Sequence, residues 1–318
     1  QGRLGTVKTD IAVFTNLTRD HLDYHGTMEE YGKAKRLLLQ QPGLKTVVLN
    51  ANDDESTKWD GAADSAIMRV WTGIDDSKDA ALLSAYNNPQ YRHCFATNAS
   101  YHAGGCSFEL VSSWGSAAIS LPLFGKFNIS NVLSAIGTLL AEGERFDAVV
   151  KAVNAITPVP GRMEVFPVPG AANLVVDYAH TPDALASALS ALRQSCAGAL
   201  WVVFGCGGDR DAGKRSEMGR IADSLADQLV VTNDNPRSEA PSLIANHILS
   251  GVSAAPCHVE LDRGEAIRYA VLGAQRGDTV LVAGKGHETY QVIGDRKLDF
   301  SDVDCAAQVL RERELAHA

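Results

Sequence analysis

Apolar segments and helix-like segments alternate along the second half of the chain. Short runs of apolar and β-branched residues are separated by longer stretches in which apolar residues recur every three or four positions. The pattern predicts strands within residues 173–179, 199–205, 228–232 and 279–284, and helices within 181–194, 214–226, 241–252, 264–275 and from Ser301 onward. Strands that alternate with helices are typical of a parallel, doubly wound sheet, so the predicted fold class is α/β.

Each of these four predicted strands runs into a polar loop rich in glycine, proline and charged residues. The loops read DYAHTPD (177–183), GCGGDRD (205–211), NDNPR (233–237) and AGKGHE (283–288). In a parallel sheet the carboxyl ends of the strands lie at one edge, and ligands bind there. We therefore expect the four loops to share one binding site.

The first half of the chain has a different pattern. Strands are predicted within 10–17 and 46–50, and helices within 27–41 and 128–143. Thr27 and Glu30 have the spacing of a capping box at the start of the first helix. Residues 65–124 alternate between apolar and polar positions with few helix signals, which predicts antiparallel strands.

Length and composition allow two globular domains. The chain has 318 residues, of which 45% are hydrophobic, and this is enough for two separate cores. Two prolines and a glycine interrupt the pattern near residues 157–166. We therefore predict one domain over residues 1–159 and a second over residues 160–318.

Charge and cysteine usage exclude several classes of protein. The net charge of −9 opposes binding to an extended nucleic acid, whose phosphates need a basic face. No run of 18 apolar residues is present, so we predict no membrane insertion. The six cysteines are scattered without a C-x-x-C pair, which favours a reduced, cytoplasmic protein over a disulfide framework or a zinc site.

The loop GCGGDRD allows a second interpretation, a turn that binds a dinucleotide. Gly205 and Gly207 match the first glycines of that fingerprint, and Asp234 follows the next strand. Arg210 stands where the third glycine is required. An NAD-dependent oxidoreductase is therefore the weaker, alternative function.

Several polar motifs have an ordinary structural explanation when each is taken alone. His21 and His25 are more often turn or core histidines than ligands. Asn128 and Asn131 can cap a helix, although their spacing at a loop-to-helix junction also suits recognition of a base edge. Residues 234–237, Asp-Asn-Pro-Arg, have the composition of a turn.

The motifs resemble one enzyme family when they are taken together in chain order. They are TNLTRDHLDYHG, YGKAKRLL, LNANDD, GKFNISN, PGRMEVF, VDYAHTPDAL, FGCGGDRDAGKR, NDNPRSE and AGKGHETYQ, and they closely resemble the ATP-dependent Mur ligases. The resemblance covers essentially all 318 residues and is to the branch that adds meso-2,6-diaminopimelate to UDP-N-acetylmuramoyl-L-alanyl-D-glutamate. It implies amide-bond synthesis through an acyl phosphate, in peptidoglycan precursor synthesis, with ATP and Mg²⁺ as cofactors.

The resemblance also implies which domains are present. Residues 1–159 resemble the latter part of a central ATPase domain, and residues 160–318 resemble a complete, Rossmann-like, doubly wound C-terminal domain. The family's N-terminal domain and its G-T-N-G-K-T phosphate loop have no counterpart in this sequence. We therefore expect a fragment that does not ligate alone, and a non-catalytic binding module is a third interpretation.

The resemblance assigns the metal and nucleotide contacts. His21 matches a magnesium ligand, and Lys35 matches a lysine carried as a carbamate, which supplies the oxygen that Mg²⁺ prefers. The residues implied near ATP are Asn128 and Asn131 at the adenine, and Asp177 and His180 at the ribose and terminal phosphate. The implied catalytic set is Lys35, His21 and His180.

The resemblance likewise assigns the substrate contacts. Gln1 and Arg3 match residues that hold the UDP-sugar peptide. The residues implied around diaminopimelate are Arg210, Asp234, Asn235, Arg237, Gly284 and Glu288. The distal end of diaminopimelate is a zwitterion, so it needs a cation for its carboxylate and an acid for its ammonium. We expect a cytoplasmic monomer with these small molecules as its partners.

Overall fold

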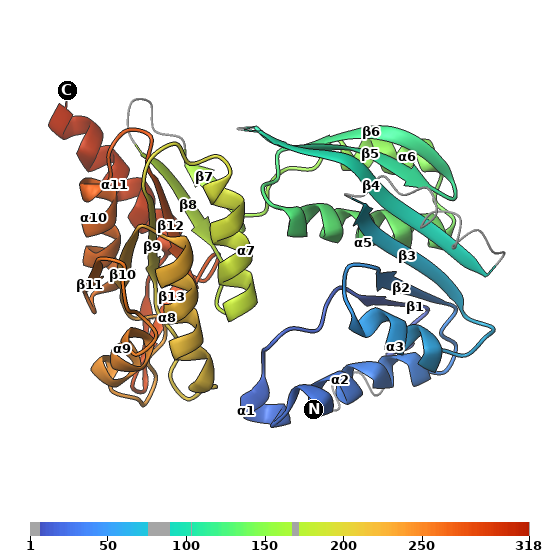
Figure 1. The fold of residues 1–318 in the computed structure, drawn as a ribbon, viewed down its shortest axis with the longest axis horizontal. Helices are drawn as coiled ribbons and strands as arrows, with labels where there is room; N and C mark the ends of the chain where they lie inside the picture. The colour runs from blue at the N-terminus through green and yellow to red at the C-terminus, as the bar shows by residue number, and fades with distance from the viewer. Residues whose placement is uncertain (1–6, 76–89, 103, 167–171, 318) are drawn as a thin grey trace. The chain divides into compact units, whose positions relative to one another are not determined.

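The computed structural model describes residues 7–75, 90–102, 104–166 and 172–317 (Figure 1). The chain forms two compact units, each with its own six-stranded sheet. The first unit comprises Gln1–Thr18 and Tyr24–Thr157, and the second comprises Arg19–Asp23 and Pro158–Ala318.

The sheet of the first unit has the strand order β1-β2-β3-β4-β5-β6. Its strands are β1 (Ile11–Phe14), β2 (Thr46–Asn50), β3 (Met68–Asp75), β4 (Tyr91–His102), β5 (Gly105–Ser112) and β6 (Gly115–Leu121). Strands β4 to β6 pair in antiparallel, as expected for residues 65–124. The expectation is wrong for β3, which pairs in parallel with β2 and β4. Alternation reports which face a side chain takes, and it does not report the direction of the neighbouring strand.

Helices cover this first sheet. They are α2 (Met28–Arg36), the 3₁₀ turn η1 (Leu37–Gln40), α3 (Glu55–Ala62), α5 (Lys126–Glu142) and α6 (Phe146–Val153), and the short α1 (Leu22–His25) precedes them. Helix α5 packs on the sheet through the fully buried Ile129, Leu133 and Ile136. Only half of the expected capping box forms: Thr27 Oγ1 accepts from the Glu30 amide at 3.2 Å, but the Glu30 carboxylate accepts from Lys33.

The sheet of the second unit has the strand order β11-β10-β9-β12-β8-β7. Its strands are β7 (Glu164–Phe166), β8 (Asn173–Asp177), β9 (Leu200–Phe204), β10 (Gln228–Val231), β11 (Cys257–Val259) and β12 (Thr279–Ala283). All neighbours pair in parallel except β7, which pairs with β8 in antiparallel. The predicted parallel sheet is therefore confirmed, and the short strands β7 and β11 are additions to it.

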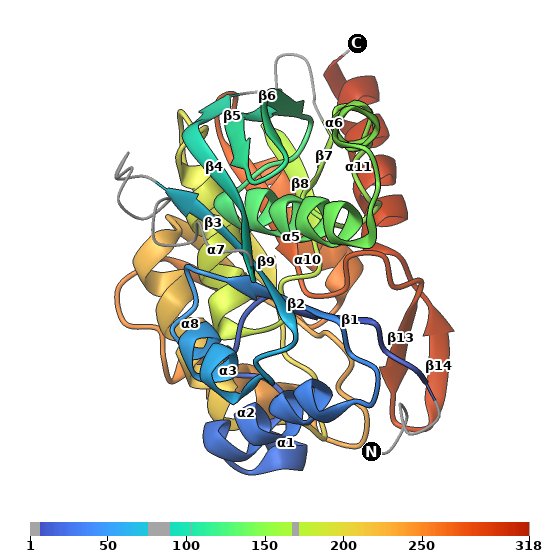
Figure 2. The same cartoon turned by 90° about the vertical axis from the view of Figure 1, so that its right-hand side faces the viewer.

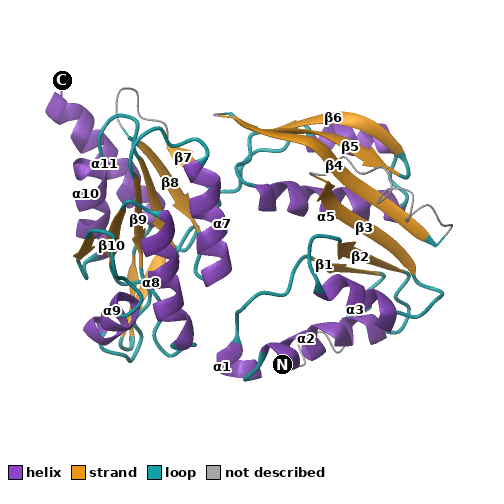
Figure 3. Ribbon diagram, viewed as in Figure 1, coloured by secondary structure: helices purple, strands orange, loops and turns teal. Residues whose placement is uncertain are grey.

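Helices lie on both faces of this second sheet, as Figure 3 shows. They are α7 (Pro182–Arg193), α8 (Gly213–Leu225), α9 (Pro241–Leu249), α10 (Arg263–Gly273) and α11 (Asp302–His317). Helices α10 and α11 form a core with alternate strand residues such as Val203, Val230 and Val282. Because both faces are covered, the strands are apolar on both sides, and this is why they appear in the sequence as continuous apolar runs.

A hairpin follows the loop after β12 and forms a two-stranded sheet separate from the six-stranded sheet of the second unit. Its strands are β13 (Tyr290–Ile293) and β14 (Arg296–Asp299), and it is clearest in Figure 2. Gly294 turns the chain with φ +58°. The amide of Arg237 donates to the Val292 carbonyl at 3.1 Å, and the Gly294 amide donates to the Arg237 carbonyl at 2.7 Å. These bonds attach the hairpin to the loop after β10.

Two further predictions from the sequence concern membrane insertion and the state of the cysteines. None of the helices within them has both the length and the apolar character needed to cross a membrane. The six cysteines are free thiols, and burial raises the pKa of Cys94 and Cys206 to about 12. These two thiols are therefore protonated, and poor nucleophiles, at neutral pH.

Candidate functional site

Parallel pairing places the carboxyl ends of β8, β9, β10 and β12 at one edge of the second sheet. We call this the carboxyl edge. The loops at this edge are residues 178–181, 205–212, 232–240 and 284–289. They overlap the four polar motifs that the sequence singled out, and the buried strands before them set their positions.

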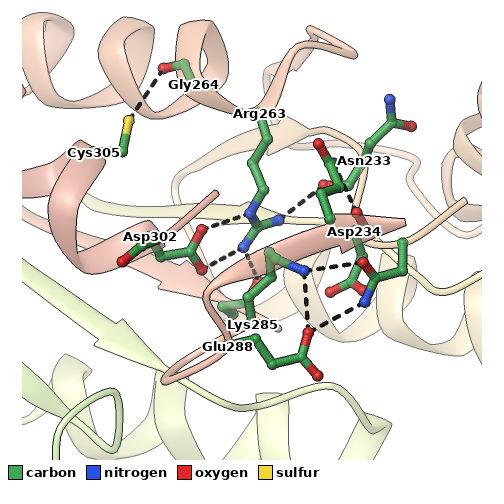
Figure 4. Close-up of polar contacts among 12 residues, drawn as sticks. Asn233, Asp234, Arg263, Gly264, Lys285, Glu288, Asp302 and Cys305 are labelled. Carbon is green, nitrogen blue, oxygen red and sulfur yellow. Dashed lines mark hydrogen bonds and ion pairs between the residues drawn. The ribbon is translucent and has the colours of Figure 1, made fainter. Parts of the chain in front are cut away.

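Lys285 links the loop after β10 to the loop after β12 (Figure 4). Its side chain is fully buried, and its Nζ lies 3.1 Å from both Asn235 Oδ1 and Glu288 Oε2. Asn235 Nδ2 also donates to Glu288 Oε2 at 3.2 Å, while Asn235 Oδ1 accepts from the Val292 amide at 2.9 Å. Two of the predicted substrate residues, Asn235 and Glu288, are thus held in fixed orientations.

Asp234 lies beside this group and is only 9% exposed. Its backbone carbonyl accepts from Gln291 Nε2 at 2.7 Å, but its carboxylate accepts no hydrogen bond from the described residues. Gly284, with φ +122°, approaches closely: a Cβ there would lie 2.7 Å from Asp234 Oδ2. A glycine is therefore required at position 284 to leave room for the carboxylate, which keeps its capacity to accept hydrogen bonds.

Arg263 holds the same two loops from inside the unit (Figure 4). Its guanidinium forms a bidentate pair with Asp302 at 2.7 and 2.8 Å, and both side chains are fully buried. It also donates to the Asn233 carbonyl and the Ala283 carbonyl, each at 3.0 Å. These carbonyls precede Asp234 and Gly284, so one buried cation positions the ends of β10 and β12.

Arg237 adopts the left-handed backbone conformation, with φ +52°. Its Nη1 donates to the Gly208 carbonyl at 2.8 Å and lies 3.4 Å from the Asn235 carbonyl. A Cβ at Gly208 would lie 1.9 Å from the Pro236 carbonyl oxygen, so the loops after β9 and β10 touch backbone to backbone. The guanidinium therefore lies between these two loops and is half-buried.

A second buried arginine fixes the loop after β9. Arg215 pairs with both oxygens of Glu239 at 2.7 and 2.9 Å and donates to the Gly207 carbonyl at 3.3 Å. Arg210, in contrast, has a side chain that is 52% exposed, and it donates to the Asp209 carbonyl at 3.3 Å. Arg210 is therefore more exposed than Arg237, the other arginine predicted to bind diaminopimelate.

The end of β8 carries the residues predicted to lie near the nucleotide. Asp177 is buried, and its Oδ1 accepts from the Met163 amide at 2.8 Å. Burial raises the pKa of the Asp177 carboxyl, and the bond from Met163 opposes that rise. His180 Nδ1 lies 2.9 Å from the Tyr178 carbonyl, and the His180 carbonyl accepts from Lys214 Nζ at 2.8 Å.

The remaining predicted site residues lie on other segments of the chain. In the first unit, Lys35 Nζ donates to the Asn16 carbonyl at 3.0 Å, and Asn128 Nδ2 donates to the Phe124 carbonyl at 2.8 Å. Asn128 and Asn131 both lie on helix α5, where Asn131 is exposed; the N-cap residue is Gly125, so neither asparagine caps the helix. His21 lies in the segment that belongs to the second unit, with φ +54°. Gln1 and Arg3 lie outside the described residues.

The described parts of the chain contain no group of three or more His, Cys, Asp and Glu side chains placed to hold a metal ion. His21 Nε2 lies 3.4 Å from Asp20 Oδ2, which is the arrangement of an ion pair.

Sequence analysis missed four residues that organise the carboxyl edge: Lys285, Arg215, Arg263 and Asp302. Lys285 lies within the motif AGKGHE. A charged residue between two glycines at the end of a strand was the local signal that could have indicated its role. Arg263 and Asp302 lie 39 residues apart, and each begins a helix. No local pattern reports such a pairing.

Protein-family models match segments of both units. Residues 1–139 match the Mur ligase middle domain, and residues 161–286 match the Mur ligase glutamate ligase domain. Together these ranges cover most of the chain.

Curated proteins and solved structures give the same picture. The UDP-N-acetylmuramoyl-L-alanyl-D-glutamate--2,6-diaminopimelate ligase of Coxiella burnetii (strain RSA 493 / Nine Mile phase I) is 45% identical over 314 residues, which are 98% of this chain and 62% of that protein. This chain therefore spans 62% of the length of that relative. A solved structure of a ligase with the same name is 36% identical, with a TM-score of 0.59, over 98% of this chain and 62% of that one.

More distant structures share the fold. The MurF ligase of Thermotoga maritima in complex with ADP is 16% identical, with a TM-score of 0.67, over 99% of this chain and 64% of that one. A pseudomurein peptide ligase type C from Methanothermus fervidus is 17% identical, with a TM-score of 0.70, over 98% of this chain and 64% of that one. With both domain models matched and this fold in common, the chain belongs to the Mur ligase family.

Proposed function

We propose that this chain is the part of an ATP-dependent ligase that binds meso-2,6-diaminopimelate, for addition to UDP-N-acetylmuramoyl-L-alanyl-D-glutamate in peptidoglycan precursor synthesis. The 45% identical relative carries that name. The observation that carries the proposal is the arrangement at the carboxyl edge, where Arg237 and the carboxylates of Asp234 and Glu288 lie on loops tied to each other. Cations and acids together suit an amino acid that is charged at both ends.

The chemistry of the site supports this assignment of ligand. The distal head of diaminopimelate carries one carboxylate and one ammonium. A guanidinium binds a carboxylate through two parallel hydrogen bonds, so Arg237, with the Arg210 side chain also beside Gly207, suits the carboxylate. The Asp234 carboxylate, which accepts no hydrogen bond from the described residues, suits the ammonium. Lysine has no distal carboxylate and would leave Arg237 without a ligand partner.

The proposal also assigns the identity of the two domains and the residues that would bind the nucleotide. Residues 1–159 would be the latter part of the central ATP-binding domain and residues 160–318 the C-terminal domain that binds amino acid. Asn128 and Asn131, one turn apart on α5, would recognise the adenine. Asp177, the last residue of β8, and His180, in the loop that follows, would bind the ribose and the terminal phosphate. Gln1 and Arg3 would contact the UDP-sugar peptide.

Magnesium belongs to this proposal together with a modified Lys35. An ammonium that donates to the Asn16 carbonyl cannot coordinate a cation. A carbamate on Lys35 would offer the hard oxygen that Mg²⁺ prefers, and His21 would be a second ligand. Lys35, His21 and His180 would then be the catalytic residues of the complete ligase, and the 318-residue chain would not ligate by itself.

The proposed function is tested by the Arg237→Ala variant of the complete ligase. We expect kcat/KM for meso-diaminopimelate to fall roughly 30-fold, because a carboxylate is left unpaired in a partly desolvated site. Any weak use of L-lysine should stay level. Arg296→Ala, an exposed arginine on the β13–β14 hairpin, is the matched control and should change neither rate. Equal losses for the two amino acids in Arg237→Ala would show that Arg237 only shapes its loop.

A further inference from the structure

Lys285 is a fully buried lysine that has no assigned role among the proposed substrate contacts. A buried ammonium is strongly destabilising unless charged and polar partners surround it. Its Nζ has two such partners at 3.1 Å, Asn235 Oδ1 and Glu288 Oε2, and the ring of Tyr290 has its centre 5.7 Å away. A core position filled by this cation suggests a purpose beyond packing.

The contacts of Lys285 determine how Glu288 can be used. Glu288 Oε2 accepts from both Lys285 and Asn235, while Oε1 accepts no hydrogen bond from the described residues. Figure 4 shows the dashed contacts converging on one oxygen of Glu288. The Glu288 side chain is 20% exposed, so its second oxygen can meet a ligand. Lys285 thereby holds the carboxylate in one orientation and leaves half of it available.

Lys285 also sets the charge of the site. Asp234 and Glu288 supply two negative charges, and Lys285 supplies one positive charge between the loops that carry them. The three groups together carry one net negative charge, which a single ligand ammonium balances. Without Lys285, one ammonium would face two carboxylates, and one of these would be left unpaired in a partly buried site.

We propose that Lys285 is a positioning and specificity residue, which orients Glu288 and reduces the local charge so that the site selects amino acids with a distal ammonium. The inference rests on the proposed function, since it concerns the same amino acid. It differs from that proposal because Lys285 acts through Glu288 and Asn235 and does not itself touch the ligand.

The test compares two ligands on the 318-residue chain by NMR titration. One is meso-diaminopimelate, and the other is L-2-aminopimelate, which keeps the distal carboxylate but lacks the distal ammonium. We expect the wild-type chain to bind meso-diaminopimelate about tenfold more tightly, because a charge-assisted hydrogen bond is at stake. Lys285→Met should reduce this preference to less than about threefold and leave the Kd of L-2-aminopimelate nearly unchanged.

Controls separate orientation from general damage. Lys297→Met removes another lysine that contacts the Tyr290 ring, at 3.8 Å, and it should keep the full preference. If thermal unfolding shows that Lys285→Met does not fold, Lys285→Gln is titrated in its place with the same expectation.

The outcomes distinguish the two proposals. A folded Lys285 variant that keeps the full preference, or that loses both ligands equally, overturns the role of Lys285 and leaves the proposed function in place. A wild-type chain that binds neither ligand counts against the amino-acid site itself, and the inference fails with it. Loss of the preference alone supports the inference.

Discussion

The two edges of the second sheet both carry buried aspartates, but they use them differently. At the edge where the parallel strands begin, Asp278 precedes β12. Its Oδ1 accepts from the Ala199 amide at 2.8 Å, and its Oδ2 accepts from the Gln275 amide at 2.8 Å and from Trp201 Nε1 at 3.3 Å. This carboxylate joins the starts of β9 and β12 and has its hydrogen-bonding capacity largely filled.

At the carboxyl edge, Asp234 has the same burial and a different environment. Asp234 and Asp278 are each 9% exposed. No described residue donates a hydrogen bond to the Asp234 carboxylate, and Gly284 leaves space beside it. Burial alone therefore does not mark a candidate ligand-binding acid, and buried aspartates with unused accepting capacity are the better candidates.

The largest expected effect comes from removing the cation that holds the carboxyl edge together. Arg263→Met leaves Asp302 as an unpaired charge in the interior and frees the Asn233 carbonyl. We expect a loss of about 3–5 kcal/mol in the free energy of unfolding, measured by urea denaturation. The matched control is Arg193→Met, whose exposed pair with Asp227 should contribute less than about 1 kcal/mol. Similar losses for the two variants would mean that burial of the pair does not matter.

The second prediction compares the two aspartates directly. Asp278→Ala leaves buried backbone and indole donors without acceptors, so we expect a loss of about 3 kcal/mol in the free energy of unfolding. Asp234→Ala removes a carboxylate that accepts no hydrogen bond from the described residues, and its loss should stay within about 1 kcal/mol. Urea denaturation of the two variants under identical conditions measures both losses in the free energy of unfolding. A larger loss for Asp234→Ala would contradict the prediction.

The smallest expected effect is a difference in the pH dependence of stability between two aspartates of the second unit, Asp223 and Asp177. Hydrogen bonds from the Ala255 and Ala254 amides and from Ser253 lower the pKa of Asp223 to about 2, from an ordinary value of 3.8. Its stabilisation is complete above pH 3.8 and is lost as pH falls through about 2. Burial raises the pKa of Asp177 above 3.8, so its ionisation lowers stability as pH rises from 3.8 through that raised pKa.

Two variants measure this pH dependence. The advantage of wild type over Asp223→Ala should shrink as pH falls from about 4 to about 2. The stability of wild type relative to Asp177→Asn should fall as pH rises above about 4. Unfolding at a series of pH values checks both, and parallel curves for either variant and wild type would rule out the assigned shift.

The sequence predicts the strands of the second sheet well because burial on both faces produces continuous apolar runs. It also predicts the four polar loops, since each follows such a run. The β13–β14 hairpin was missed because its residues are mostly exposed and it lies outside the alternating pattern. Strand β3 was assigned the wrong direction because alternation does not encode direction.

The interior of the candidate site could not be predicted to the same extent. Local motifs indicated Asp234, Asn235 and Glu288, but not the buried cations that position them. Lys285 and Arg263 carry full charges, and charged side chains are ordinarily exposed, so their burial depends on partners brought together only by folding. Hydrogen-bond saturation, which distinguishes Asp278 from Asp234, is likewise a property of the folded chain.

The most direct test of the account is a crystal structure of the 318-residue chain with meso-diaminopimelate. We predict density for one amino-acid head at the carboxyl edge, with its ammonium within hydrogen-bonding distance of Asp234 or Glu288 and its carboxylate at Arg237. Density elsewhere, such as beside Asp278, would contradict the account. So would an empty carboxyl edge in crystals soaked at a concentration that saturates binding in solution.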